Sequence, residues 1–206
     1  SGNPAFTQIP NFHFLSEARY RGTRFVVISP DYNATAMHAD YWVPVRPGTD
    51  AALALAIARE LIELQLHDEA LLREQTDLPL LVRLDTGEFL RESDLVADGN
   101  RKLMYFWDAR TQRPVLAPGT EDHPTPALSL GELDPALEGN FGVRVKEGQE
   151  VRVAPVMALL REQLDTWTIE RTAQVTGLHP DQIRVFAEGF ARAERPLILS
   201  SWGSNR

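Results

Sequence analysis

Two short apolar runs and the segments around them constrain the fold of this chain most strongly. RFVVIS at 24–29 and YWVPV at 41–45 have the β-branched and aromatic composition of strands, with turn-rich residues between them. Helical spacing over 10–21 precedes the first run, and Gly22 can end that helix. A second helix, predicted over 49–67, follows the second run. Helix, strand, loop, strand, helix is the order of an α/β protein.

The helix predicted over 49–67 begins with AALALAIA, which is apolar on nearly all sides. This pattern predicts burial between layers rather than exposure on a surface. Similar patterns predict further elements, with Thr168 as a helix N-cap and Pro180 at the start of a helix. The remaining predicted helices are 68–76, 156–167, 168–177 and 180–194, and the remaining predicted strands are 78–85, 102–108, 141–148, 150–155 and 196–202.

The predicted fold is a Rossmann-like α/β domain, with a mostly parallel sheet flanked by helices. Strands separated by helices pair in parallel, so we expect 24–29 and 196–202 to be parallel neighbours. Residues 86–150 are rich in Gly, Pro, Asp and Glu, which indicates a β-rich or irregular insertion. The chain is then one domain, with a core of about 1–85 and 150–206.

Net charge and composition exclude several kinds of partner. The 206 residues carry a formal charge of −8 with a pI near 5.1, whereas nucleic acid and anionic membranes attract a positive field. No apolar run approaches the ~18 residues of a membrane span. Cys is absent, so this stretch has no disulfide, thiol nucleophile or iron–sulfur ligand. Small molecules or other proteins are the expected partners.

Both ends of the chain have the composition of internal sequence. SGNPAFTQIP has neither an initiator Met nor the basic and apolar regions of a signal peptide. LILSSWGSNR ends directly after an apolar run that normally leads into a further element. We therefore expect the chain to be an internal piece of a longer protein.

No complete catalytic or metal-binding set is present. Neither the dinucleotide fingerprint nor the P-loop occurs, and no serine lies in a nucleophile-elbow motif. The histidines lack the short spacings of zinc sites. We therefore predict no catalytic residue and no metal ligand within this stretch. The histidines are His13, His38, His67, His123 and His179.

Small and polar residues follow several predicted strands. In open α/β sheets, ligands bind outside the carboxyl ends of the strands. Four loops of this kind are therefore the candidate binding positions. They are Ser1-Gly2-Asn3-Pro4, Ser29-Pro30-Asp31-Tyr32, Pro47-Gly48-Thr49-Asp50 and Gly203-Ser204-Asn205.

Two carboxylates in these loops have both a structural and a ligand-binding interpretation. Asp50 is either a first-turn helix carboxylate favoured by the macrodipole, or an acceptor for the adjacent N1–H and N2–H₂ donors of guanine. Asp31 is either an Asx-turn residue or an acceptor for a sugar hydroxyl. The Gly-Ser-Asn loop at 203–205 is suited to contact a phosphate through its backbone N–H groups.

The order of these motifs resembles the large-subunit family of molybdopterin oxidoreductases, the dimethyl-sulfoxide-reductase superfamily. EARYRGT, SPDY and PGTDAALALA resemble the branch with respiratory nitrate, selenate and chlorate reductases, dimethylsulfide dehydrogenase and ethylbenzene dehydrogenase. The resemblance resumes in REQTDLPLLVRLDTGEFLRESDL, in LDPALEGNF and in the segment from 176 to 205. It spans nearly the full chain and is weakest over 97–130.

The resemblance implies an α/β domain that holds one of two molybdopterin guanine dinucleotides in a molybdenum enzyme. The metal ligand, the iron–sulfur cluster and most catalytic residues lie outside this segment in such proteins. The positions that match cofactor-binding residues are Asn3, Pro30, Asp31, Gly48, Thr49, Asp50, Gly203, Ser204 and Asn205.

The resemblance also implies partners and a compartment. The partners are the rest of the catalytic subunit and an iron–sulfur electron-transfer subunit, with a heme subunit as a further option. The implied compartment is the periplasm, with the cytoplasm as the alternative. We expect the isolated segment to show no metal and no turnover. The competing hypothesis is a free-standing α/β module that binds a small molecule or a protein.

Overall fold

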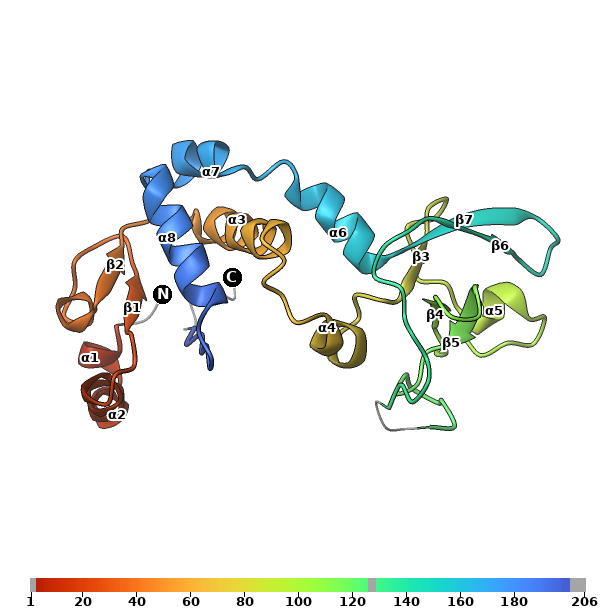
Figure 1. Ribbon diagram of the computed structural model, residues 1–206, viewed down its shortest axis with the longest axis horizontal. Helices are drawn as coiled ribbons and strands as arrows, with labels where there is room; N and C mark the ends of the chain where they lie inside the picture. Colours follow the sequence, from red (N-terminus) through yellow and green to blue (C-terminus); the bar gives the residue numbers. More distant parts are fainter. Residues whose placement is uncertain (1–2, 126–128, 201–206) are drawn as a thin grey trace. The chain divides into compact units, whose positions relative to one another are not determined.

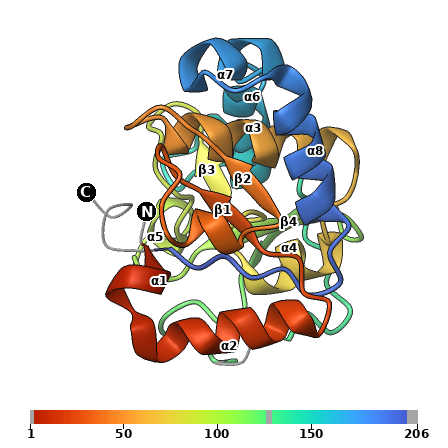
Figure 2. The ribbon, with the colours of Figure 1, turned by 90° about the vertical axis from the view of Figure 1, so that its left-hand side faces the viewer.

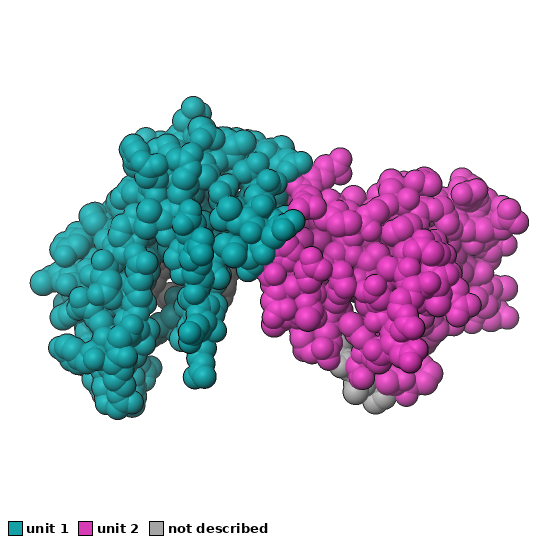
Figure 3. Space-filling model, viewed as in Figure 1, with its two compact units in different colours: residues 1–66, 164–206 teal, residues 67–163 magenta. Residues whose placement is uncertain are grey.

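The computed structural model describes residues 3–125 and 129–200, which form two compact units (Figures 1 and 3). Unit 1 comprises 1–66 and 164–206, and unit 2 comprises 67–163. Helices flank the strands, which confirms the predicted α/β class. The described sheets contain both parallel and antiparallel pairs of strands. Unit 2 is larger than the insertion expected over 86–150, because residues 67–85 and 151–163 also belong to it.

Unit 1 is built on a parallel pair of strands, β1 and β2. The register places Val26 opposite Tyr41 and Ile28 opposite Val43, so both strands end at the same edge. In both ribbon views, this pair lies between α2 and α7 (Figures 1 and 2). The described elements of unit 1 are α1 (Pro4–Thr7), α2 (Ile9–Tyr20), β1 (Val26–Ile28), a 3₁₀ turn (Ala36–His38), β2 (Tyr41–Val43), α3 (Asp50–Glu63), α7 (Ile169–Thr176) and α8 (Pro180–Ala191).

Local signals set the ends of the helices in unit 1. Gly22 follows α2 with φ +94°, and its N–H donates to the Arg19 carbonyl at 2.9 Å. A left-handed glycine of this kind satisfies the last carbonyls of a helix. Thr168 caps α7, because its Oγ1 accepts a hydrogen bond from the Arg171 N–H at 3.2 Å. Pro180 occupies the first turn of α8. These three predictions are confirmed.

The helix α3 buries one face instead of being enclosed on all sides. Ala51 and Ala54 are exposed, so the expected burial between layers is wrong for that side of the helix. An exposed methyl group costs little free energy, and alanine therefore marks a buried face poorly. The helix also ends at Glu63, before the predicted end near 67. The buried side chains of α3 are Ala52, Leu53, Ala56 and Ile62.

The apolar run at the C-terminal end of the chain does not form the predicted strand. Residues 196–200 have no strand conformation, and β1 pairs with β2 in the sheet of unit 1. The prediction that 24–29 and 196–202 are parallel neighbours is therefore wrong for the described residues. Leu197, Ile198 and Leu199 are 84%, 73% and 63% exposed. Strand composition favours an extended chain, but a strand also needs a partner for its backbone donors and acceptors.

Unit 2 contains the predicted β-rich region. An antiparallel sheet has the order β3-β7-β6, and β4 and β5 form a separate antiparallel pair. The strand predicted over 78–85 contributes β3, which pairs with β7. The described elements of unit 2 are α4 (Glu69–Gln75), β3 (Leu81–Arg83), α5 (Glu92–Leu95), β4 (Tyr105–Asp108), β5 (Arg113–Leu116), β6 (Phe141–Arg144), β7 (Glu150–Pro155) and α6 (Val156–Leu164), whose last residue lies at the boundary with unit 1.

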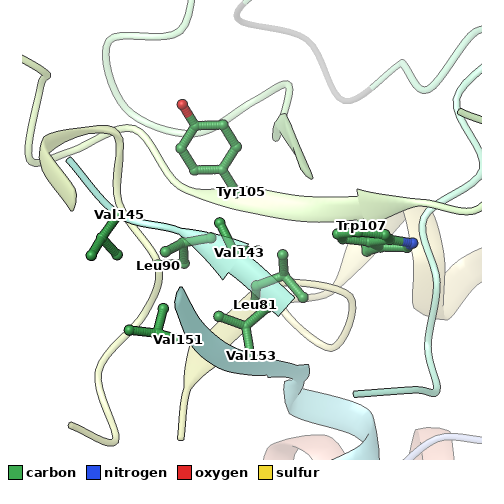
Figure 4. Close-up of a cluster of buried hydrophobic side chains, with 8 residues drawn as sticks. All are labelled: Leu81, Leu90, Tyr105, Trp107, Val143, Val145, Val151 and Val153. Carbon is green, nitrogen blue, oxygen red and sulfur yellow. The ribbon is translucent and has the colours of Figure 1, made fainter. Parts of the chain in front are cut away.

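One apolar cluster joins the strands of unit 2 (Figure 4). Leu81 on β3 and Val153 on β7 are both fully buried. The Trp107 ring on β4 stacks on the Phe141 ring of β6, with 4.2 Å between ring centroids. Exposed and buried residues alternate over the first four residues of β7, as in a sheet with one face on the core. The cluster consists of Leu81, Leu90, Tyr105, Trp107, Val143, Val145, Val151 and Val153.

A buried carboxylate organises the turn between β4 and β5. Asp108 is 2% exposed, and its Oδ2 accepts a hydrogen bond from Thr111 Oγ1 at 2.6 Å. Its Oδ1 accepts from the backbone N–H of Asp134 at 3.0 Å. Burial acts to raise the pKa of the Asp108 carboxyl, but the hydrogen bonds from Thr111, Asp134 and Arg110 outweigh burial and lower this pKa.

We predict that Asp108→Asn lowers the free energy of unfolding by about 1–3 kcal/mol at neutral pH, because an amide replaces an acceptor of several hydrogen bonds. A lowered folded-state pKa stabilises the fold above the usual value of about 3.9, and this stabilisation is lost as pH falls through the folded-state pKa. Urea unfolding at pH 6 and pH 3 measures both effects.

The matched control is Asp98→Asn, because the Asp98 carboxylate is exposed and makes no hydrogen bond among the described residues. The wild-type chain and the control should lose stability between the two pH values, and Asp108→Asn should lose less. An equal loss in all three proteins would show that Asp108 contributes nothing to acid sensitivity.

Candidate functional site

The parallel pairing of β1 and β2 brings two of the candidate loops to one edge. Residues 29–32 leave the carboxyl end of β1, and residues 44–49 leave the carboxyl end of β2 and lead into α3, which begins at Asp50. Figure 2 shows the two strands side by side, with α3 beyond them. This edge is where open α/β sheets bind ligands. The candidate site is therefore built from these two strand exits.

The loop after β1 is held by its neighbour on β2. Ser29 is 1% exposed, and its Oγ donates to the Asp31 carbonyl at 2.8 Å. The indole N–H of Trp42 donates to the Ser29 carbonyl at 3.0 Å, and the Trp42 ring meets the Tyr32 ring edge-on. Pro30 and Asp31 are exposed, and among the described residues the Asp31 carboxylate has no hydrogen-bond or ion-pair partner.

Asn3 is brought to the same loop through Thr35. Its Oδ1 accepts hydrogen bonds from the Thr35 hydroxyl and from the Thr35 N–H, the latter at 3.2 Å. The N–H of Ala5 in turn donates to Thr35 Oγ1 at 3.0 Å. Thr35 is 2% exposed, so this contact is internal. The Asn3 amide oxygen is thus engaged by the protein, and only its Nδ2 donor remains for a ligand.

The turn before α3 presents Asp50 at the start of the helix. Gly48 has φ +80°, a conformation that favours glycine, and no atom lies within 4 Å of where its Cβ would stand. Thr49 does not cap α3, because its Oγ1 donates to the Arg46 carbonyl at 2.7 Å. Asp50 is exposed, and within the described ranges its carboxylate forms no hydrogen bond or ion pair.

The sequence-predicted residues therefore divide into three groups. Asn3, Pro30 and Asp31 lie in or against the loop after β1, and residues 48–50 lie at the neighbouring strand exit. The loop 203–205 lies outside the described residues. Sequence reasoning missed Thr35, Trp42 and Arg46, which hold the loops by hydrogen bonds over long sequence separations. Their residue types carry no local signal for this role.

Other features of the described residues do not suggest a different site. A small hollow is lined by Phe12, Phe25 and His38, together with three further residues, and lies at the amino end of β1 rather than at the strand exits. No group of three His, Asp or Glu residues suited to a metal ion occurs in 3–125 or 129–200. In the same residues, no helix is long and apolar enough to cross a membrane.

The fold and the site define a mixed α/β protein whose candidate ligand-binding residues gather at the carboxyl ends of parallel strands. A family model described as molybdopterin oxidoreductase matches residues 2–206. The chain belongs to the molybdopterin oxidoreductase family.

Relatives match the sequence of this chain over nearly its full length. It is 41% identical to dimethylsulfide dehydrogenase subunit alpha of Rhodovulum sulfidophilum and 43% identical to chlorate reductase subunit alpha of Ideonella dechloratans, over 99% of this chain in both cases. Perchlorate reductase subunit alpha of Dechloromonas aromatica is 40% identical over 98% of this chain. The chain spans only 22%, 22% and 24% of these relatives, or about a quarter of their length at most.

A solved structure supports the fold. Acetylene hydratase from Pelobacter acetylenicus matches 96% of this chain and 16% of its own, with a TM-score of 0.53 and 18% sequence identity. At this identity the match concerns the fold alone. The chain therefore has the fold of a segment within a much longer protein of known structure.

We predict that Thr35→Val loosens the N-terminal segment, because it removes the hydroxyl that links Asn3 to Ala5 while keeping the shape of the side chain. The loss of these hydrogen bonds should lower the free energy of unfolding by about 1–2 kcal/mol. Thermal unfolding measures the loss, and limited proteolysis detects earlier cleavage near α1. Thr23→Val is the control, because Thr23 is exposed. Equal effects of both substitutions would contradict a specific role for Thr35.

Proposed function

We propose that this chain is the part of a molybdenum oxidoreductase catalytic subunit that binds the guanine-nucleotide end of one molybdopterin guanine dinucleotide. Family membership and the two exposed carboxylates at neighbouring strand exits support this proposal. Asp31 and Asp50 have no protein partner among the described residues, so both are available to accept hydrogen bonds. When bound, the cofactor supplies oxygen-atom and electron transfer.

The carboxylate of Asp50 has the chemistry to recognise guanine. An ionised carboxylate only accepts hydrogen bonds, and guanine presents N1–H and N2–H₂ side by side as donors. Adenine lacks this pair of donors, so the same carboxylate selects against it. Asp50 lies in the first turn of α3, where the helix dipole interacts favourably with a negative charge.

The other residues at this edge fit a nucleotide as well. Asp31 can accept hydrogen bonds from the sugar hydroxyls, and Gly48 leaves the space that a side chain would fill. Asn3 can contribute its Nδ2 donor. The roles of Gly203, Ser204 and Asn205 are part of the same proposal, although these residues lie outside the described ranges. The loops bind and orient one end of the cofactor, and no residue of this chain is assigned a catalytic step.

The names of the relatives support a proposal about the parent enzyme. They act on dimethylsulfide, chlorate and perchlorate, and each is a subunit alpha. We infer that the parent transfers oxygen atoms and electrons to or from a small oxyanion, sulfide or hydrocarbon. Its partners are then the rest of its own subunit and an iron–sulfur electron-transfer subunit. The match to enzyme subunits across the chain weighs against a free-standing interaction module.

We predict that Asp50→Asn in the full-length enzyme weakens cofactor binding by roughly 2–3 kcal/mol, because an NH₂ donor then faces the donors of guanine. Molybdenum and guanine nucleotide per protein should both fall. The melting temperature of the apoprotein should change little, since the helix-dipole contribution of one exposed carboxylate is only about 0.3–1 kcal/mol.

The control is Asp181→Asn, which removes a carboxylate from the first turn of α8. Asp181 is distant in sequence from both strand exits. It should lower stability slightly and leave cofactor content unchanged. Full cofactor content in the Asp50→Asn enzyme, with a small loss of stability as in the control, would show that Asp50 only starts a helix.

A further inference from the structure

Arg46 joins the turn before α3 to a helix end that is distant in sequence. Its backbone N–H donates to the Thr176 carbonyl at 2.9 Å, and its Nη1 donates to the Gln174 carbonyl at 2.9 Å. Gln174 follows Arg46 by 128 residues along the chain. The ribbon views show α7 beside α3 (Figures 1 and 2). One residue therefore holds the exit of β2 against the C-terminal end of α7.

The turn that presents Asp50 is itself hydrogen-bonded to Arg46. The Arg46 carbonyl accepts hydrogen bonds from Thr49 Oγ1 at 2.7 Å and from the Thr49 N–H at 3.2 Å. Thr49 immediately precedes Asp50, the first residue of α3. The position of the Arg46 backbone thus sets the position of Thr49 and the direction in which Asp50 leaves the turn.

The end of α7 is a suitable anchor for a guanidinium group. The last carbonyls of a helix lack partners within the helix and carry the negative end of its dipole, so a cation beside them is stabilised. Gly177 ends α7 with φ +78°, and a Cβ at this position would lie 2.9 Å from Arg46 Nε. The absence of a side chain at Gly177 therefore leaves room for the Arg46 side chain.

We propose that Arg46 is a positioning residue for cofactor binding, and that it acts by fixing the turn that presents Asp50. This inference rests on the proposed function, in which Asp50 accepts hydrogen bonds from guanine. Arg46 itself contacts α7 through its guanidinium group and does not need to touch the ligand. A preorganised carboxylate binds with a smaller loss of conformational freedom than one on a loose turn.

The test uses the full-length enzyme and the rate at which it loses guanine nucleotide and molybdenum, measured well below its melting temperature. We expect Arg46→Gln to speed this loss by about tenfold, the equivalent of one hydrogen bond to a charged group. In an Asp50→Asn background, Arg46→Gln should add little, because the group that it positions is already altered. Arg46→Lys keeps the charge and should restore part of the retention.

The double-mutant comparison separates positioning from a purely structural role. A structural role predicts the same fold-change from Arg46→Gln with Asp50 and with Asn at position 50, and this result would overturn the inference while leaving the proposed function intact. If Asp50→Asn alone leaves cofactor loss unchanged, the proposed function fails instead, and the positioning role fails with it.

A second pair of variants tests the inference if Arg46→Gln does not fold. Gly177→Ala displaces the Arg46 side chain but leaves the turn sequence unchanged. Gly22→Ala is its matched control, because Gly22 has φ +94° and nothing within 4 Å of the Cβ position. Faster cofactor loss in Gly177→Ala than in Gly22→Ala supports the inference, and equal loss in the two variants overturns it.

Discussion

The parallel pairing of β1 with β2 is the constraint on which the rest of unit 1 depends. Each strand has only three residues, too few to be stable alone, so the pair relies on burial against the helices. Val43, Leu53 and Ile183 are each at most 1% exposed and join β2, α3 and α8 in one core. Burying such a side chain stabilises a fold by about 1.5–3 kcal/mol. The helices thereby hold both strand exits at one edge.

Local sequence patterns predict most of the helices and strands, but they do not predict which strands pair with each other. Gly22, Thr168 and Pro180 act within a few residues of their own positions, so the sequence predicts the helix ends that they make. The run 196–200 has strand composition but no strand, and the predicted strand 78–85 pairs with β7 in unit 2. Both outcomes depend on which partner is available in space, which composition does not encode.

The candidate site was predictable to the same extent. The strand-exit rule led to Asp31 and Asp50, and the structure leaves both carboxylates without a partner among the described residues. Neighbouring polar groups have structural roles. Thr35 donates a hydrogen bond to the Asn3 side-chain oxygen, and Trp42 holds the loop after β1. These contacts join residues that are far apart in sequence, so no local spacing of residues predicts them. The acceptors that are available to a ligand can be recognised only when the structure shows which other polar groups already form hydrogen bonds within the protein.

The division of the chain also bears on how it folds during synthesis. Unit 2 is one continuous stretch, whereas the core of unit 1 joins α3 to α7 and α8 across that stretch. Gln174 follows Arg46 by 128 positions, so at ~5–20 residues per second it is synthesised roughly 6–26 seconds later. The apolar face of α3 therefore has no α7 or α8 to cover it during most of that interval. Unit 2 can complete its sheets first, whereas α3 must wait for α7 and α8 before its apolar face is covered.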